Sequence, residues 1–79
     1  MNNKILVVVY VPSTDEEYDI FIPINKKVGT IKKIIVNSIP EFDSNKKYTL
    51  INLEDNKEVE TNVYVKGSSI KNGARLLLI

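Results

Sequence analysis

The sequence contains no cysteine and no histidine. Without cysteine the chain forms no disulfide bond and offers no thiolate nucleophile, and without either residue it has no Cys/His zinc site and no iron–sulfur ligands. Histidine is also the side chain that most often moves protons near neutral pH. We therefore expect a protein that is not an enzyme, has no catalytic residues and needs no cofactor or metal.

The chain also lacks a strong charge of either sign and a long hydrophobic run. Eleven Lys and Arg against ten Asp and Glu leave a formal charge of +1, whereas binding to a phosphate backbone usually needs a basic excess. The apolar run Ile5 to Val11 is far shorter than the ~20 residues of a membrane span, and proline and acids follow it instead of a signal-peptide cleavage site. These features predict a cytoplasmic protein without membrane insertion and without a nucleic-acid partner.

Alanine occurs only once, against eleven Ile and nine Val. Because β-branched side chains fit a pleated sheet better than a helix, an all-helical bundle is not expected. A chain of 79 residues has room for one core, and no linker or low-complexity segment divides it. We expect a single domain over residues 1–79.

Alternating apolar residues predict two strands in the first third of the chain. The run Ile5 to Val11 is apolar on both faces, which is typical of a central strand or of one whose second face meets a partner. After the turn-rich stretch "PSTDEE", the segment Tyr18 to Ile24 alternates with a period of two and predicts a hairpin partner with one buried face. Pro23 cannot donate a ladder hydrogen bond, so this second strand is expected at a sheet edge.

From residue 29 the apolar period changes to that of a helix. Thr30 is the predicted N-cap, and Pro40 is expected to end the helix because the residue before a proline is disfavoured in the α region. The predicted apolar face consists of Ile31, Ile34, Ile35 and Ile39.

Three shorter strands are predicted after the helix: residues 48–53, residues 57–61 around Val59, and residues 75–79 after an Asn72-Gly73 turn. The stretch "NVYVKGSS" has no clear pattern. The order β-β-α-β-β-β predicts an α+β fold in which a mixed sheet of four to five strands packs on one helix. The first strand is best explained if the last strand lies parallel beside it at the centre, which is the β-grasp arrangement.

The element order and the closing segment "SSIKNGARLLLI" resemble the ubiquitin-like β-grasp fold over essentially the whole chain. In that family a buried Ile precedes a turn and a last alternating strand, which matches Ile70, Asn72-Gly73 and residues 76–79. The "YDIFIP" strand also resembles one bacterial branch, the small YukD/EsaB-type ubiquitin-like proteins of type VII secretion. This resemblance implies an accessory or regulatory role at such a secretion system.

The resemblance also raises an alternative, a carrier protein that acts as a sulfur carrier or a modifier. Such carriers activate a flexible C-terminal Gly-Gly, whereas this sequence has Ile79 on the predicted last strand. If the chain is complete, conjugation and thiocarboxylate transfer are not expected.

The last strand supplies the main candidate site. If Leu76 and Leu78 face the helix, as the resemblance implies, Leu77 and Ile79 point to the other side of the sheet, and Ile51 does so from the neighbouring strand. Ile51, Leu77 and Ile79 are therefore predicted to form an apolar patch that docks on another protein, which the resemblance places in a secretion system. A locally covered patch and self-association through this face are the alternatives.

Charged residues give two weaker candidate sites. The acids are predicted to lie in solvated turns or on a short exposed strand, and neither "DEE" nor "EDN" has the spacing of a calcium loop. They are Asp15, Glu16, Glu17, Asp55, Glu58 and Glu60. The lysines at 26, 27, 32 and 33, with those at 46 and 47, are interpreted either as a solvated face or as a surface for an acidic partner.

Overall fold

The predicted element order is present in the computed structural model, which describes residues 3–79. The elements in chain order are β1 (Lys4–Val11), β2 (Glu16–Pro23), α1 (Val28–Ser38), β3 (Leu50–Asn52), β4 (Lys57–Glu58), the 3-10 helix η1 (Val65–Gly67) and β5 (Ala74–Leu78). The stretch without a clear sequence pattern thus contains η1. β3 and β4 are shorter than the alternation suggested, because turns and loops take up the flanking residues, whereas β5 has the predicted length and begins one residue earlier.

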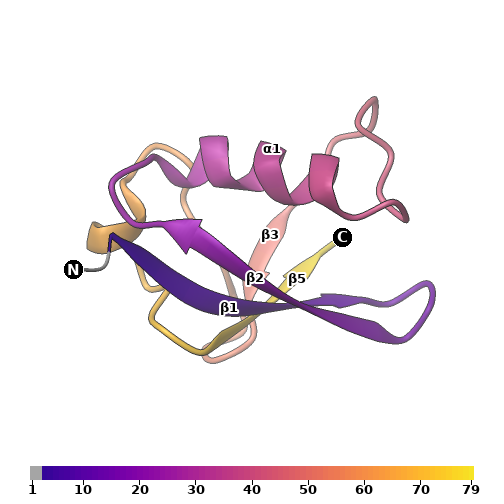
Figure 1. Cartoon of the computed structure of the whole chain (residues 1–79), viewed down its shortest axis with the longest axis horizontal. Coiled ribbons are helices and arrows are strands. Elements are labelled where there is room, and N and C mark those ends of the chain that lie inside the picture. The colour runs from indigo at the N-terminus through magenta and orange to yellow at the C-terminus, as the bar shows by residue number, and fades with distance from the viewer. Residues whose placement is uncertain (1–2) are drawn as a thin grey trace.

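The five strands form one mixed sheet in the order β2-β1-β5-β3-β4, and α1 lies across one of its faces (Figure 1). β1 and β5 are parallel and the other pairs are antiparallel. The fold is therefore the predicted α+β, ubiquitin-like arrangement, with first and last strands side by side in the interior of the sheet. Pro23 lies at the end of an edge strand, as its missing N–H requires.

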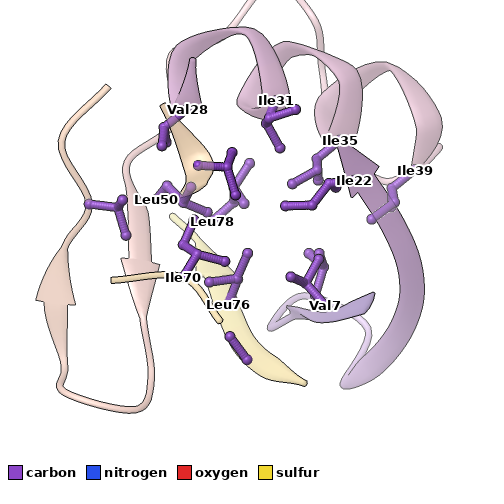
Figure 2. Close-up of a cluster of buried hydrophobic side chains, with 14 of the residues drawn as sticks. Val7, Ile22, Val28, Ile31, Ile35, Ile39, Leu50, Ile70, Leu76 and Leu78 are labelled. Atoms are coloured by element: carbon purple, nitrogen blue, oxygen red, sulfur yellow. The ribbon is translucent and has the colours of Figure 1, made fainter. Parts of the chain in front are cut away.

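The core lies between α1 and the inner face of the sheet (Figure 2). Figure 2 shows the side chains of Ile31 and Ile35 pointing from the helix toward the strands. On the strand side, the fully buried positions alternate along β1 and β5, as the two-residue period requires. The apolar core residues of the strands are Val7, Val9, Val11, Ile22, Leu50, Ala74, Leu76 and Leu78.

The helix differs from the prediction at its start and on one flank. It begins at Val28 with Lys27 in the N-cap position, so the prediction of Thr30 as N-cap is wrong. The segment that precedes η1 supplies the missing acceptors, because the Val28 N–H donates to the Val63 carbonyl and the Gly29 N–H to the Thr61 carbonyl.

Ile34 was predicted on the buried helix face, but its side chain is 40% exposed. At 3.6 residues per turn it lies about 100° from the centre of the buried stripe, which is formed by Val28, Ile31 and Ile35. Pro40 ends the helix as predicted: Ile39, the residue before it, has the extended backbone angles φ −109° and ψ 117°.

The Asn72-Gly73 turn fixes where β5 meets β1. The Asn72 side-chain Oδ1 accepts a hydrogen bond from the Leu6 N–H (2.9 Å), and the Gly73 N–H donates to the Leu6 carbonyl (2.7 Å). Gly73 has φ +86°, a value that side-chain-bearing residues rarely adopt. The turn predicted from the sequence therefore sets the register of the central parallel pair.

Candidate functional site: the outer face of the sheet

The face of the sheet opposite α1 carries a row of apolar side chains from four strands, which we call the outer face. Its members alternate with the buried core positions or pair in register with outward residues of a neighbouring strand. The outer face consists of Leu6, Val8, Tyr10, Phe21, Ile51, Leu53, Leu77 and Ile79.

The structure brings the three predicted site residues close together. Ile51 in β3 is directly opposite Leu77 in β5, and the two side chains lie on the same face. Ile79 follows two residues later, and its backbone exchanges two hydrogen bonds with Thr49, of 2.7 and 3.1 Å. The last residue is thus held in the sheet and presents its side chain on the predicted side.

The three residues differ in exposure. The Ile79 residue is 61% exposed, whereas Ile51 and Leu77 are only half-buried because neighbouring side chains cover part of each. The exposed part of each apolar side chain is in contact with water, and its removal from water on docking would be favourable. Ile79 is therefore the most accessible of the three predicted contacts.

Phe21 belongs to the same face and was missed by the sequence prediction. It pairs with Leu6 across β1 and β2 and is 68% exposed, more than any other large apolar residue among 3–79. The period-two pattern does place Phe21 on the polar side of β2, two residues after Asp19. A large aromatic residue on the solvent side of an otherwise amphipathic strand was the signal that would have identified it.

The structure also settles which side of β1 faces outward. Val7, Val9 and Val11 are buried in the core, so Leu6, Val8 and Tyr10 lie on the outer face and are half-buried there. A first strand with two apolar faces thus serves the core on one side and the outer face on the other.

An ion pair crosses the middle of the outer face. Arg75 in β5 and Glu17 in β2 lie on the two strands that flank β1, and the Arg75 guanidinium donates to a Glu17 carboxylate oxygen. Arg75 is in register with Val8 and Glu17 with Tyr10, so the pair spans the outward side of β1. It separates Phe21 at one end of the face from Ile51, Leu77 and Ile79 at the other.

Two tyrosine hydroxyls mark the hairpin end of the molecule. The Tyr10 hydroxyl donates to an Asp15 carboxylate oxygen (2.6 Å), and this hydrogen bond raises the pKa of Tyr10. The Tyr18 hydroxyl lies 2.8 Å from a carboxylate oxygen of Glu41, a hydrogen bond that raises the pKa of Tyr18 and lowers the pKa of Glu41. Each phenol holds its proton and acts as a donor near neutral pH, which fits a structural role.

The acidic residues form no cluster within residues 3–79 that could hold a metal ion. All six acids considered in the sequence are exposed, and no group of three potential ligands is close enough to hold an ion in this part of the chain. Glu17 is paired with Arg75, and Asp55 accepts a hydrogen bond from the Lys57 N–H in the β3–β4 turn. Their positions agree with the interpretation as turn and surface residues.

No helix within residues 3–79 has the length and apolar character needed to cross a membrane. Comparison with protein-family models gives no match, and comparison with curated proteins gives none either.

Proposed function

We propose that this protein is a non-enzymatic, ubiquitin-like interaction module that docks on another protein through the outer face of its sheet. The observation that carries the proposal is the apolar surface itself: Ile79 and Phe21 are largely exposed at its two ends, with half-buried apolar residues between them. Exposed apolar residues that gather on one face, here on both sides of the Arg75–Glu17 pair, mark an interaction site more often than a single exposed Leu or Ile does.

The Arg75–Glu17 pair adds polar specificity to this surface. Its two side chains are about half exposed (52% and 48%), so a partner that covers the face must also satisfy their remaining hydrogen-bonding groups. The arrangement has apolar contacts at both ends and a polar element in the middle. It favours a partner with two apolar anchors and a hydrogen-bonding group between them.

We also propose that the partner is a component of a bacterial type VII secretion system and that the protein acts there in the cytoplasm as an accessory or regulatory factor. This part rests on the resemblance of "YDIFIP" and "SSIKNGARLLLI" to the YukD/EsaB-type proteins. The fold, a five-stranded mixed sheet with one helix in the β-grasp order, is compatible with that family.

The test is site-specific photo-crosslinking in the native host with benzoylphenylalanine at Phe21. The replacement keeps an aromatic side chain at an exposed position, whereas a bulky group at half-buried Ile51 would disturb the sheet. The matched control carries the same crosslinker at Ile34, which is 40% exposed on the helix side. We expect Phe21 to crosslink a secretion-system component and Ile34 not to.

The second arm compares Ile79→Asp with Ile34→Asp, which place the same charge on opposite surfaces. We expect the Ile79 variant to remain folded and to lose the crosslink, because a carboxylate in an apolar contact is costly to desolvate. The Ile34 variant should keep it. If Phe21 crosslinks only a second copy of the chain, the outer face is an oligomer contact and the proposal is wrong; capture of a protein unrelated to secretion would overturn the assignment of the partner.

A further inference from the structure

A second surface lies beside α1 and reaches the sheet at Thr49 and Glu58. Four lysines surround one open hollow of about 670 Å³: Lys32 and Lys33 from α1, and Lys46 and Lys47 from the loop that leads to β3. The rest of its lining consists of Val36, Asn37, Ser44, Tyr48, Thr49 and Glu58. The volume is in the range of hollows that hold small ligands or a few side chains.

The structure divides the lysines that the sequence placed near the helix start. Lys26 and Lys27 precede α1 and are not part of the hollow, whereas Lys32 and Lys33 join the lysines of the distant loop. The positive charge is thus gathered by the fold from two segments and not by one run of sequence. Among residues 3–79 no carboxylate forms an ion pair with any of the four.

One of these lysines is held in place by the backbone. The Lys32 ammonium donates to the Tyr48 carbonyl (2.8 Å), which uses one of its three N–H donors and links α1 to the loop. Tyr48 is fixed in turn, because its ring packs edge-to-face on Phe42 at 5.0 Å and its hydroxyl accepts the Asp43 N–H (2.8 Å). The loop side of the hollow is therefore ordered before any ligand arrives, which reduces the entropy lost on binding.

The charge balance indicates what kind of ligand fits. The hollow has four lysines and one carboxylate, Glu58, while the rest of the chain has seven basic residues against nine acidic ones. A small anionic ligand that stays within the hollow is attracted by its lysines. A long polyanion such as a nucleic acid would extend beyond the hollow and be repelled by the net negative charge of the rest of the protein. Val36 and Tyr48 are half-buried and give the hollow an apolar floor for one uncharged side chain.

We propose that this hollow binds a short acidic segment of a partner protein. Carboxylates of the segment pair with the ammonium groups of Lys33, Lys46 and Lys47, and an apolar side chain between them contacts Val36 and Tyr48. The hollow adjoins the outer face at Thr49 and Glu58, but the proposal does not depend on the function proposed for that face.

The test uses a blocked peptide in which glutamates flank a central leucine, titrated into ¹⁵N-labelled protein. The test variant is Lys33→Gln with Lys47→Gln, which keeps the Lys32 hydrogen bond to the loop. The matched control is Lys26→Gln with Lys66→Gln, which removes the same charge from exposed residues outside the hollow. An unlabelled oligonucleotide and the glutamine version of the peptide serve as competing ligands.

We expect saturable shifts at residues that line the hollow and a roughly three- to tenfold weaker dissociation constant for the Lys33/Lys47 variant, with little change in the control. Glu58→Gln should tighten binding by about twofold, because it removes the single carboxylate of the lining. Equal weakening in both double variants, binding of the glutamine peptide with the same affinity, or tighter binding of the oligonucleotide would each overturn the proposal. A Phe21→Asp variant, which is changed on the distant edge strand β2 and outside the hollow, should bind the peptide normally, so this test is independent of the one for the outer face.

Discussion

Asn52 is the buried polar residue of the described chain, and its replacement by alanine gives a sharp test of how the sheet is stabilised. Its amide nitrogen donates to the carbonyl and to the hydroxyl of Ser69 (3.1 Å each), and its side-chain oxygen accepts the Glu54 N–H (3.0 Å). These bonds join the end of β3 to the segment that leads into β5. The residue thus ties together two parts of the sheet that are adjacent in space and not in sequence.

The magnitude follows from the number of bonds lost. Three hydrogen bonds at about 1 kcal/mol net each give about 3 kcal/mol, and because Ser69 and Glu54 are exposed enough to regain water, we expect Asn52→Ala to lose about 2–3 kcal/mol. A domain of this size is typically stable by roughly 4–12 kcal/mol, so the variant should still fold. Ser69→Ala removes only the hydroxyl bond and should lose about 0.5–1 kcal/mol.

Urea denaturation followed by far-ultraviolet circular dichroism measures both variants, with an unchanged slope as the sign that the folded state is intact. The variant Asn52→Asp tests whether the amide donor is needed. Its carboxylate would lie against the Ser69 carbonyl without the N–H that asparagine donates to it. Burial and repulsion should raise the pKa of the new carboxyl, so this variant should gain stability relative to wild type as the pH falls through that pKa. A loss below about 1 kcal/mol for Asn52→Ala would refute the reasoning that these bonds are net stabilising.

Two further predictions concern the backbone and the hairpin end. Gly73→Ala should lower the free energy of unfolding by about 1–2 kcal/mol, because residue 73 has a positive φ. Gly67 has no positive φ, and a Cβ there would meet no neighbouring atom, so Gly67→Ala should be neutral or slightly stabilising. Urea midpoints measure both effects, and equal effects would contradict this prediction. Tyr18→Phe removes the hydrogen bond that lowers the pKa of Glu41. The extra stability of the wild type over Tyr18→Phe should therefore be full above the ordinary glutamate pKa and disappear as the pH falls through the lowered pKa of Glu41 in the folded protein. A difference in urea midpoint between the two proteins that stays constant across acidic pH would contradict this prediction.

Much of the fold follows from local patterns in the sequence. The period-two alternation of "YDIFIP" and "ARLLL" places buried and outward residues correctly because a strand with one face on a core has no other register available. Pro40 and the Asn72-Gly73 turn act through backbone restrictions that any surroundings would preserve. The three predicted contact residues lie on one face for the same reason.

The remaining features depend on residues far apart in the chain. Thr30 is a chemically suitable N-cap, but backbone carbonyls at 61 and 63 satisfy the first helical N–H groups and let the helix begin earlier. The Arg75–Glu17 pair and the Lys32 bond to the Tyr48 carbonyl likewise join segments whose proximity is set only by the sheet order. Phe21 was missed because local alternation gives the side of a strand and not what its neighbours leave exposed.

The position of β5 between β1 and β3 has a consequence for how the protein is made. Its parallel pairing joins Val7 to Ala74, so the central contact of the sheet closes almost the whole chain into a loop and gives the fold a high contact order. During synthesis β1 is made first and β5 after every other strand. Until β5 is made, no strand lies between β1 and β3 to join the two parts of the sheet. The outer face, built from β1, β2, β3 and β5, is complete only after β5 has joined the sheet, and a partner that recognises the whole face would bind only from then on.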